Sequence, residues 1–521
     1  MTTVHDLLRD GAKRHGDRAA ILFGERTVSY AGLLDETERF AAGLAALGLG
    51  QTDVVASIMD NSWETIVAWL GASLTGCADV PINPQYRGDL LAYLLADCGA
   101  TAVICDAAHL PALLQVADRL PALRLVVVNG TASQQPSHPR LTFVGFDEVD
   151  APAAQAPNVT GAQERVILYT SGTTGPSKGV IHTQRTCGML SRYNAKVLDY
   201  SPADRLLNFF PLYHQNARYT GVMPALHSGA SIRMEKRFSS SNFWNTVRAD
   251  GTTAFNYLGS VLRLILNVTP DGFGKNDHTL RKAFGAGAAP LVWKEFEERL
   301  GIRFAETYGL TEAPMATIND GISGRRSPIG SAGRASELFE IAVVGDDDDF
   351  VAPDTIGEIV VRPRQPHTVM AGYLNKDAAT VAAFRNLWFH TGDRGRLSAE
   401  GDLYFEERGK DSIRRRGENI SAWEVESVLD QHPDVAESAV YGVASDEADE
   451  EVVAAVVLKD KAADLSAILA FAEERLPRYA VPTLLKVLSD LPRTPTEKVQ
   501  KAELRKEGRA GCVSAAELRR R

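Results

Sequence analysis

Small and hydroxyl-bearing residues gather in one run of the sequence, YTSGTTGPSKG, which spans residues 169–179. A β-branched stretch over residues 164–170 leads into this run and predicts a strand that ends in a loop. Glycines let backbone N–H groups approach a ligand closely, the Ser and Thr hydroxyls add donors, and Lys178 adds positive charge. The run therefore predicts a loop that surrounds phosphate groups.

Two better-known nucleotide patterns do not fit this chain. A Walker loop needs Gly at position 177 and Ser or Thr at position 179, but the sequence has Ser177 and Gly179. A dinucleotide fingerprint fails in the run Gly285 to Pro290, because proline stands where its last glycine is needed. A plain Gly/Ser/Thr linker, in turn, does not account for a lysine that closes a glycine-punctuated loop directly after a strand.

A hydroxyl and a carboxylate stand next to each other at Thr311 and Glu312. Hard oxygen ligands of this kind suit Mg²⁺ that bridges phosphate oxygens, although a glutamate outside such a motif is usually a surface charge. The four aspartates at 346–349 lack the spaced ligands of a calcium loop. We expect them at the solvated tip of a hairpin within residues 338–362.

The elements that must position these groups alternate between helix and strand. Over residues 1 to about 160, an amphipathic helix is predicted at 34–47 and strands at 54–59 and 102–105. This alternation predicts an α/β fold with layered helices and strands.

The chain changes to a compact βαβ-like pattern after residue 408. Ser421 and Glu424 have the spacing of a capping box at the start of a helix. A strand is predicted at 452–458 and a second amphipathic helix at 465–476. The remaining length suffices for a separate domain.

Composition narrows the class of protein. With 521 residues, 45% hydrophobic residues and a net charge of -10, the chain should fold into two to four units and is a poor partner for nucleic acid. Five cysteines without a C-x-x-C pair fit a reducing compartment and plain thiols. No apolar run suits a signal peptide or a membrane span, so we expect a cytoplasmic protein without a membrane partner.

The loop TSGTTGPSKG resembles the phosphate loop of the AMP-forming acyl-CoA synthetases and related adenylate-forming enzymes. Six further segments resemble motifs of that family in the same order: Pro81–Pro84, Gly285–Pro290, Tyr308–Glu312, Thr391–Asp393, Arg408–Asp411 and Pro495–Lys498. The run at 236–244 and the segment from Gly417 are most like crotonobetaine/carnitine-CoA ligases and medium-chain or aromatic acid ligases. The resemblance implies a large, multi-subdomain N-terminal adenylating domain over residues 1–408. It also implies a small, mobile α+β domain over 409–521, with a hinge near Lys410.

The resemblance also implies how ATP is bound. The residues that contact ATP or AMP are Thr170, Ser171, Gly172, Thr173, Thr174, Gly175, Lys178, Gly287, Ala288, Ala289, Tyr308, Asp393 and Arg408. The ring of Tyr308 offers a face to adenine unless it is a core aromatic, and the two oxygens of Asp393 suit the ribose hydroxyls. Glu312 holds Mg²⁺, Thr311 contacts the α-phosphate, and Lys498 is the catalytic lysine of adenylation, whose ammonium reduces the repulsion between two anions.

The resemblance also implies which residues form the acyl and thiol sites. The acyl pocket is formed by His214, Asn256, Tyr257, Gly259 and Gly285, and His214 lies between this pocket and the thiol tunnel unless it is a core histidine. Aromatic and small residues in these segments imply a hydrophobic carboxylic acid. Arg416, Gly417 and Glu418 face CoA, whose phosphates favour fixed positive charge, although the basic run that begins at Arg414 could be a solvated patch.

The implied reaction has two steps. An acid and ATP give acyl-AMP and pyrophosphate, and CoA then displaces AMP, so ATP, Mg²⁺ and CoA are the expected cofactors and co-substrates. Two alternatives stay open: an adenylating enzyme that loads a carrier-protein phosphopantetheine, and a catalytically silent homologue, which the presence of Lys498 and Glu312 disfavours. Glu407 and Gly409 depart from the family pattern and imply a hinge that is either looser or differently biased. The sequence leaves open which acid is used, the pathway and the oligomeric state, with a homodimer among the options.

Overall fold

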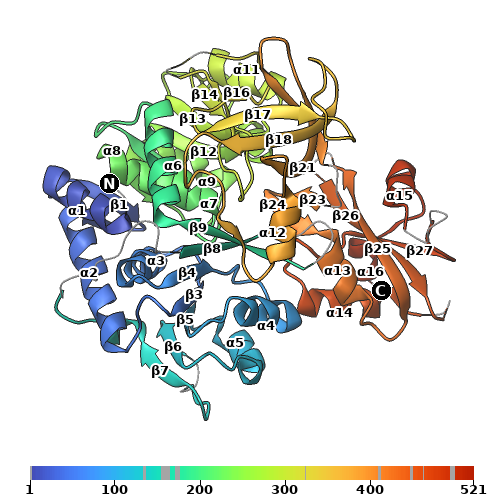
Figure 1. Ribbon diagram of the computed structural model, residues 1–521, viewed down its shortest axis with the longest axis horizontal. Helices are drawn as coiled ribbons and strands as arrows, with labels where there is room; N and C mark the ends of the chain where they lie inside the picture. Colours follow the sequence, from blue (N-terminus) through green and yellow to red (C-terminus); the bar gives the residue numbers. More distant parts are fainter. Residues whose placement is uncertain are drawn as a thin grey trace. The chain divides into compact units, whose positions relative to one another are not determined.

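The computed structural model describes residues 3–132, 136–153, 165–170, 176–322, 324, 326–408, 412–445, 450–460, 463–492 and 499–520, without the side chains of residues 260, 407, 408, 412 and 502. The chain divides into two compact units (Figure 1). The first unit comprises residues 1–84, 92–168 and 179–407, and the second comprises residues 85–91, 169–178 and 408–521. Each unit buries hydrophobic clusters of its own.

The first sheet of the first unit is largely parallel. Its described strands follow the order β16 (Arg334–Ala335), β15 (Thr317–Asp320), β14 (Arg303–Glu306), β13 (Lys282–Ala286), β12 (Ala254–Leu258), β10 (Arg205–Asn208), β11 (Ser231–Met234), β1 (Ala19–Phe23) and β2 (Arg26–Ser29). The strands from β14 to β1 in this order pair in parallel, which requires crossover connections. The helices α8 (Met223–Ser228), α10 (Gly259–Asn267) and α11 (Pro290–Glu298) pack against it.

The second sheet is also largely parallel. Its order is β19 (Gly372–Tyr373), β9 (Lys178–Thr183), β8 (Arg165–Thr170), β4 (Ala78–Pro81), β3 (Val54–Ile58), β5 (Ala102–Asp106), β6 (Leu125–Asn129) and β7 (Thr142–Gly145). Helix α3 (Trp63–Thr75) packs on β3 and β4, and α2 (Tyr30–Ala46) packs on α3 (Figure 1). The predicted strands at 54–59 and 102–105 and the predicted helix at 34–47 are confirmed as β3, β5 and α2, with ends that differ by a few residues.

Further α-helices of this unit are α1 (Val4–His15), α4 (Gly88–Asp97, whose first residues belong to the second unit), α5 (Leu110–Val116), α6 (Gln184–Val197), α7 (Gln215–Ala217), α9 (Ser240–Asp250) and α12 (Asp377–Ala383). None of the helices in the described ranges combines the length and the apolar character that crossing a bilayer requires.

The third sheet contains the predicted hairpin. It consists of β17 (Phe339–Val344), β18 (Gly357–Pro363), β21 (Trp388–Leu397), β20 (Phe384–Arg385) and β22 (Leu403–Arg408). Strands β17 and β18 pair in antiparallel register, and the aspartate run lies at their turn. Asp346, Asp347 and Asp349 are exposed, whereas Asp348 forms an ion pair with Arg385 at 3.1 Å. The solvated tip is therefore confirmed, with one aspartate held by an arginine.

The second unit contains a hairpin and a small sheet. The hairpin joins β23 (Ser412–Arg415) to β24 (Glu418–Ser421), and the sheet has the order β25 (Val435–Ala444), β26 (Glu450–Leu458), β27 (Leu484–Leu488) and β28 (Val513–Ser514). Helix α14 (Leu465–Arg475) connects the parallel strands β26 and β27. Three further helices are α13 (Ala422–Leu429), α15 (Lys501–Glu507) and α16 (Ala515–Leu518).

The capping box predicted at the start of α13 is only half present. The hydroxyl of Ser421 accepts the backbone N–H of Glu424 at 3.4 Å. The Glu424 carboxylate accepts a hydrogen bond from Ser177, which also belongs to the second unit. Burial raises the pKa of Glu424 to about 7.

The five cysteines are free thiols. Cys77, Cys98, Cys105 and Cys187 are buried, and Cys512 is partly exposed. Burial raises the pKa of Cys98 and of Cys105 to about 12. The sequence-based expectation of plain thiols is confirmed.

A buried ion pair ties three segments of the first unit together. The guanidinium of Arg218, in a π-helical turn over Arg218–Val222, pairs with the carboxylate of Asp79 in β4. It also lies over the ring of Trp69 in α3, 4.6 Å from the centroid, and its Nε donates to the carbonyl oxygen of Leu212. Because both charges are fully buried, each depends on the other for compensation.

A buried histidine joins β9 to the loop after β14. The Nε2–H of His182 donates to the carbonyl oxygen of Thr311 at 2.6 Å. Burial lowers the pKa of His182 to about 4, so the ring is neutral near pH 7 and carries its proton on the nitrogen that faces the carbonyl.

We expect Arg218→Met to lower the free energy of unfolding of the first unit by about 3–5 kcal/mol, because Asp79 would become a buried charge without its partner. Urea unfolding followed by tryptophan fluorescence measures this loss. The double variant Asp79→Leu/Arg218→Met should recover most of it. If Arg218→Met unfolded at the same urea concentration as the wild type, that result would contradict this account.

The pKa of His182 predicts an acid-dependent loss of stability. The unfolded chain binds a proton near the ordinary histidine pKa of 6.5, whereas the native chain does so only near 4. Between these values the unfolded state binds more protons, so stability falls as the pH decreases. Between pH 6.5 and pH 4, the free energy of unfolding of the wild type should fall by up to about 3 kcal/mol more than that of His182→Gln, as measured by urea titrations at each pH. Parallel stability curves for the two proteins would rule this out.

Candidate functional site

The loop that follows β14 holds Thr311 and Glu312. Both side chains are partly buried, and three groups from other elements anchor this dipeptide. His182 holds the Thr311 carbonyl, the backbone N–H of Met370 donates to the Glu312 carbonyl at 2.8 Å, and the Tyr373 hydroxyl donates to Oε1 of Glu312 at 2.8 Å. The predicted metal ligand therefore has a defined position next to β9 and β19.

Tyr308 and Asp393 meet although 85 residues separate them. Both side chains are buried, and the Tyr308 hydroxyl donates to Oδ2 of Asp393 at 2.9 Å. The backbone at Asp393 is held by the Thr391 hydroxyl, which accepts its N–H at 3.1 Å and donates to the carbonyl oxygen of Ile359 at 2.6 Å. The structure thus brings together two residues that the sequence places at adenine and ribose.

Close backbone packing explains the glycines near the ends of β12 and β13. A Cβ at Gly285 would overlap the carbonyl oxygen of Tyr257, and a Cβ at Gly259 would overlap that of Gly287. Gly287 has φ +73, and the next residue, Ala288, donates its N–H to the buried Glu306 at 2.7 Å. Crevices at the carboxyl ends of parallel strands are the usual ligand sites of such sheets. Gly259, Gly285, Gly287, Ala288 and Ala289 lie at this edge.

The other predicted acyl-pocket side chains are held by different contacts. Asn256 is buried and its amide donates to Oδ1 of Asn216 and to the carbonyl oxygen of Thr220, both at 3.0 Å. Tyr257 is fully buried and packs on Phe304, with ring centroids 5.0 Å apart. His214 is partly exposed at the start of a short helical segment. Their part in binding an acid stays a prediction.

The tip of the β23–β24 hairpin carries the residues predicted to face CoA. Arg416 and Gly417 have φ values of +52 and +86, the pattern of a two-residue turn in which both residues are left-handed. Arg416 is exposed, and Gly417 and Glu418 are partly exposed. Arg415, by contrast, is buried and donates to the carbonyl oxygen of Tyr479 at 2.8 Å, so the basic run is not a uniform surface patch.

Several predicted residues lie outside the described part of the chain. These are Ser171, Gly172, Thr173, Thr174, Gly175, Lys410 and Lys498, together with the side chain of Arg408. Two flanking residues of the phosphate loop are described: Thr170 ends β8 and Lys178 begins β9.

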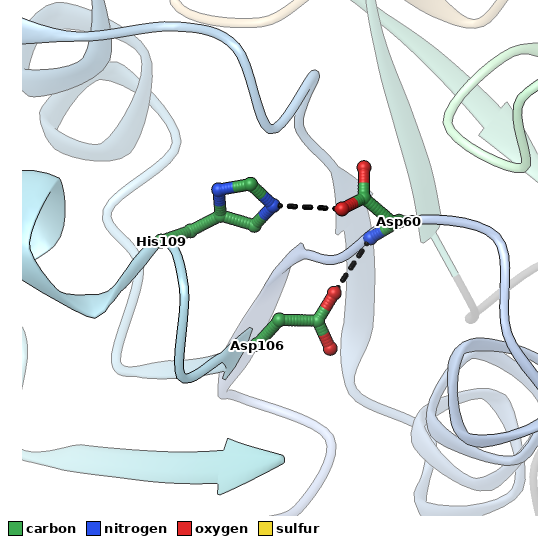
Figure 2. Close-up of side chains that lie close together, drawn as sticks. All are labelled: Asp60, Asp106 and His109. Carbon is green, nitrogen blue, oxygen red and sulfur yellow. Dashed lines mark hydrogen bonds and ion pairs between the residues drawn. The ribbon is translucent and has the colours of Figure 1, made fainter. Parts of the chain in front are cut away.

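A group that the sequence did not indicate lies at the ends of β3 and β5. Figure 2 shows Asp60, Asp106 and His109, whose side chains offer oxygen and nitrogen atoms close together. His109 Nε2 lies 3.1 Å from Asp60 Oδ2, and Asp106 accepts the backbone N–H of Asp60 at 2.8 Å and the amide of Asn129 at 2.8 Å. These bonds join the loops that follow two adjacent strands.

Sequence reasoning missed the groups that anchor Glu312. His182 bonds a residue 129 positions away, and Tyr373 bonds one 61 positions away. Contacts between residues so far apart in the sequence produce no local spacing pattern that could predict them.

Comparisons with known proteins show the family of the chain. Residues 8–374 match the AMP-binding enzyme family, and residues 424–498 match the C-terminal domain of AMP-binding enzymes. The chain is 29% identical to a crotonobetaine/carnitine–CoA ligase of Salmonella arizonae over 95% of its length and 97% of that protein. It is 31% identical to an indoleacetate–CoA ligase of Aromatoleum aromaticum over 94% of each.

A solved structure shows the same fold. The o-succinylbenzoate CoA synthetase of Bacillus subtilis, bound to a product analogue, superposes with a TM-score of 0.82 at 26% identity, covering 96% of this chain and 98% of that one. The resemblance read from the ordered motifs is confirmed. The chain belongs to the AMP-binding enzyme family, among its acid–CoA ligases.

Proposed function

We propose that the chain joins a hydrophobic carboxylic acid to CoA in two steps, through acyl-AMP. The observation that carries this proposal is the hydrogen bond from Tyr308 to Asp393 of β21. Tyr308 stands in the same loop after β14 as the anchored pair Thr311–Glu312. Such an arrangement suits a nucleotide whose base and ribose lie at Tyr308 and Asp393 and whose phosphates lie towards Thr311. The loop from Thr170 to Lys178 and the side chain of Arg408 complete the nucleotide site in this proposal.

Mg²⁺ fits the chemistry of the same loop. Glu312 offers carboxylate oxygens and Thr311 a hydroxyl, which are the hard ligands that this cation prefers, and Glu312 is held in place by its neighbours. When bound there, the cation would offset negative charge on the phosphates. Glu312 would hold it, and Thr311 would contact the α-phosphate.

The transfer step is assigned to Lys498. A lysine ammonium directed at the attacking carboxylate and the α-phosphorus reduces their repulsion as they approach. We assign residues 1–408 and 409–521 to the two domains and Lys410 to the hinge. The small domain would then present Lys498 in the first step and Arg416, Gly417 and Glu418 to CoA in the second.

The acid itself is chosen by a few side chains. Phe209 packs against Phe210 and Phe238, with ring centroids 4.9 and 4.8 Å apart, so the segment before His214 is strongly aromatic. This favours a hydrophobic acid bounded by His214, Asn256, Tyr257, Gly259 and Gly285. The relatives are named for crotonobetaine or carnitine, indoleacetate and sulfoacetate, so sequence similarity does not identify one acid as the substrate.

A panel of aliphatic, aromatic and polycyclic acids tests the proposal. We expect acid-dependent pyrophosphate exchange with ATP, and AMP release that requires CoA. Lys498→Ala should reduce the exchange at least about 100-fold, since it removes a charge that acts at the transition state. Lys506→Ala, which removes an exposed lysine of α15, is the matched control. Exchange that no acid stimulates would refute the function, and discharge of the adenylate by a carrier protein but not by CoA would refute the acceptor.

Arg416 tests the thiol half of the reaction. Asparagine is favoured at the first position of a left-handed two-residue turn, so Arg416→Asn should keep the hairpin and remove only the charge. We expect the KM for CoA to rise about tenfold, as one lost phosphate contact implies. Arg505→Asn on α15 removes the same charge from another exposed site. An equal change in both variants would count against a local role for Arg416.

A further inference from the structure

Tyr373 makes a contact that the proposed reaction has not yet used. Its hydroxyl donates to Oε1 of Glu312 at 2.8 Å, and its side chain is buried. Because an ionised carboxylate oxygen can only accept a hydrogen bond, the phenol O–H is the donor in this contact.

The backbone around Tyr373 fixes the direction of this hydroxyl. Strand β19 pairs with β9 in antiparallel register, with Gly372 opposite Ile181 and Tyr373 opposite Val180. The N–H groups of residues 371 and 374 donate to carbonyl oxygens of β9 at 2.8 Å, and the Tyr373 N–H donates to the Thr380 hydroxyl at 2.9 Å. We call residues 370–374 the β9 strap, because they lie along β9 and contact Glu312 at both its backbone and its side chain.

The β9 strap joins Glu312 to a strand that carries other predicted site residues. Strand β9 begins at Lys178, the one charged residue of the predicted phosphate loop, and contains His182, which holds the carbonyl of Thr311. A glutamate has three rotatable side-chain bonds and loses rotamer freedom when it binds a cation. A fixed donor on one oxygen confines the carboxylate before binding and leaves lone pairs for a cation.

We propose that Tyr373 is a positioning residue that holds the Glu312 carboxylate for a divalent cation and the phosphates of ATP. The proposal rests on the function proposed above, because it takes Glu312 as the metal ligand. It assigns the effect to the hydroxyl alone, whereas a purely structural role would belong to the buried ring.

The substitution Tyr373→Phe separates these two roles, because it removes the oxygen and keeps the ring. Tyr200→Phe is the matched control: Tyr200 is also buried, and its hydroxyl has no hydrogen-bond partner among the described residues. Removing an unsatisfied hydroxyl should change little. Thermal melting of both variants verifies that each is folded.

Mn²⁺ serves as the probe, titrated into the full chain with a non-hydrolysable ATP analogue and followed by electron paramagnetic resonance. We expect Tyr373→Phe to weaken Mn²⁺ binding about tenfold, as loss of a hydrogen bond to a charged group implies, and Tyr200→Phe to match the wild type. The ATP-dependent activity of Tyr373→Phe should recover as free Mg²⁺ is raised.

A double-mutant cycle with Glu312→Gln decides whether the hydroxyl acts through the carboxylate. In that background Tyr373→Phe should change Mn²⁺ binding by less than about twofold. Additive losses, or wild-type Mn²⁺ binding by Tyr373→Phe, would overturn the positioning role while leaving the proposed function intact. If the wild type itself neither bound Mn²⁺ with the ATP analogue nor exchanged pyrophosphate with any acid, the proposed function would fail as well.

Discussion

The burial of one charge pair underlies the architecture of the larger unit. Arg218 and Asp79 are both removed from water, and neither can be solvated without opening the core. The pair therefore fixes where β4, α3 and the aromatic segment that ends at His214 meet, since the guanidinium also contacts Trp69 and the carbonyl of Leu212.

Long-range hydrogen bonds then shape the chemical groups of the site. Tyr308, in the loop after β14 of the first sheet, donates a hydrogen bond to Asp393 on β21 of the third sheet. Glu312 receives hydrogen bonds from the β9 strap. Each contact joins a loop to a strand or a neighbouring loop, so the polar side chains are held before any ligand arrives. Such preorganisation is how a site stabilises charge without paying for rearrangement during the reaction. The glycines at 259 and 285 serve the same end by letting the ends of β12 and β13 approach closely.

The sequence predicted what depends on local pattern. Strands β3 and β5, helix α2 and the aspartate hairpin follow from periodicity and turn chemistry, and the ordered motifs identified the family. Prediction from the sequence failed where a side chain has two competing hydrogen-bond partners or a partner far away in the chain. Glu424 has the spacing of a capping residue but bonds Ser177, and Arg415 stands in a basic run but is buried against Tyr479. His182 and Tyr373 act over 129 and 61 residues, and no window of the sequence contains both partners.

The distribution of thiols has a practical consequence. Four cysteines of the larger unit are enclosed, and burial keeps the thiols of Cys98 and Cys105 protonated and inert. Cys512, on the smaller unit, is the one cysteine with partial access to solvent. A maleimide fluorophore would therefore attach to the native chain at a single place on the smaller unit, without any engineered cysteine.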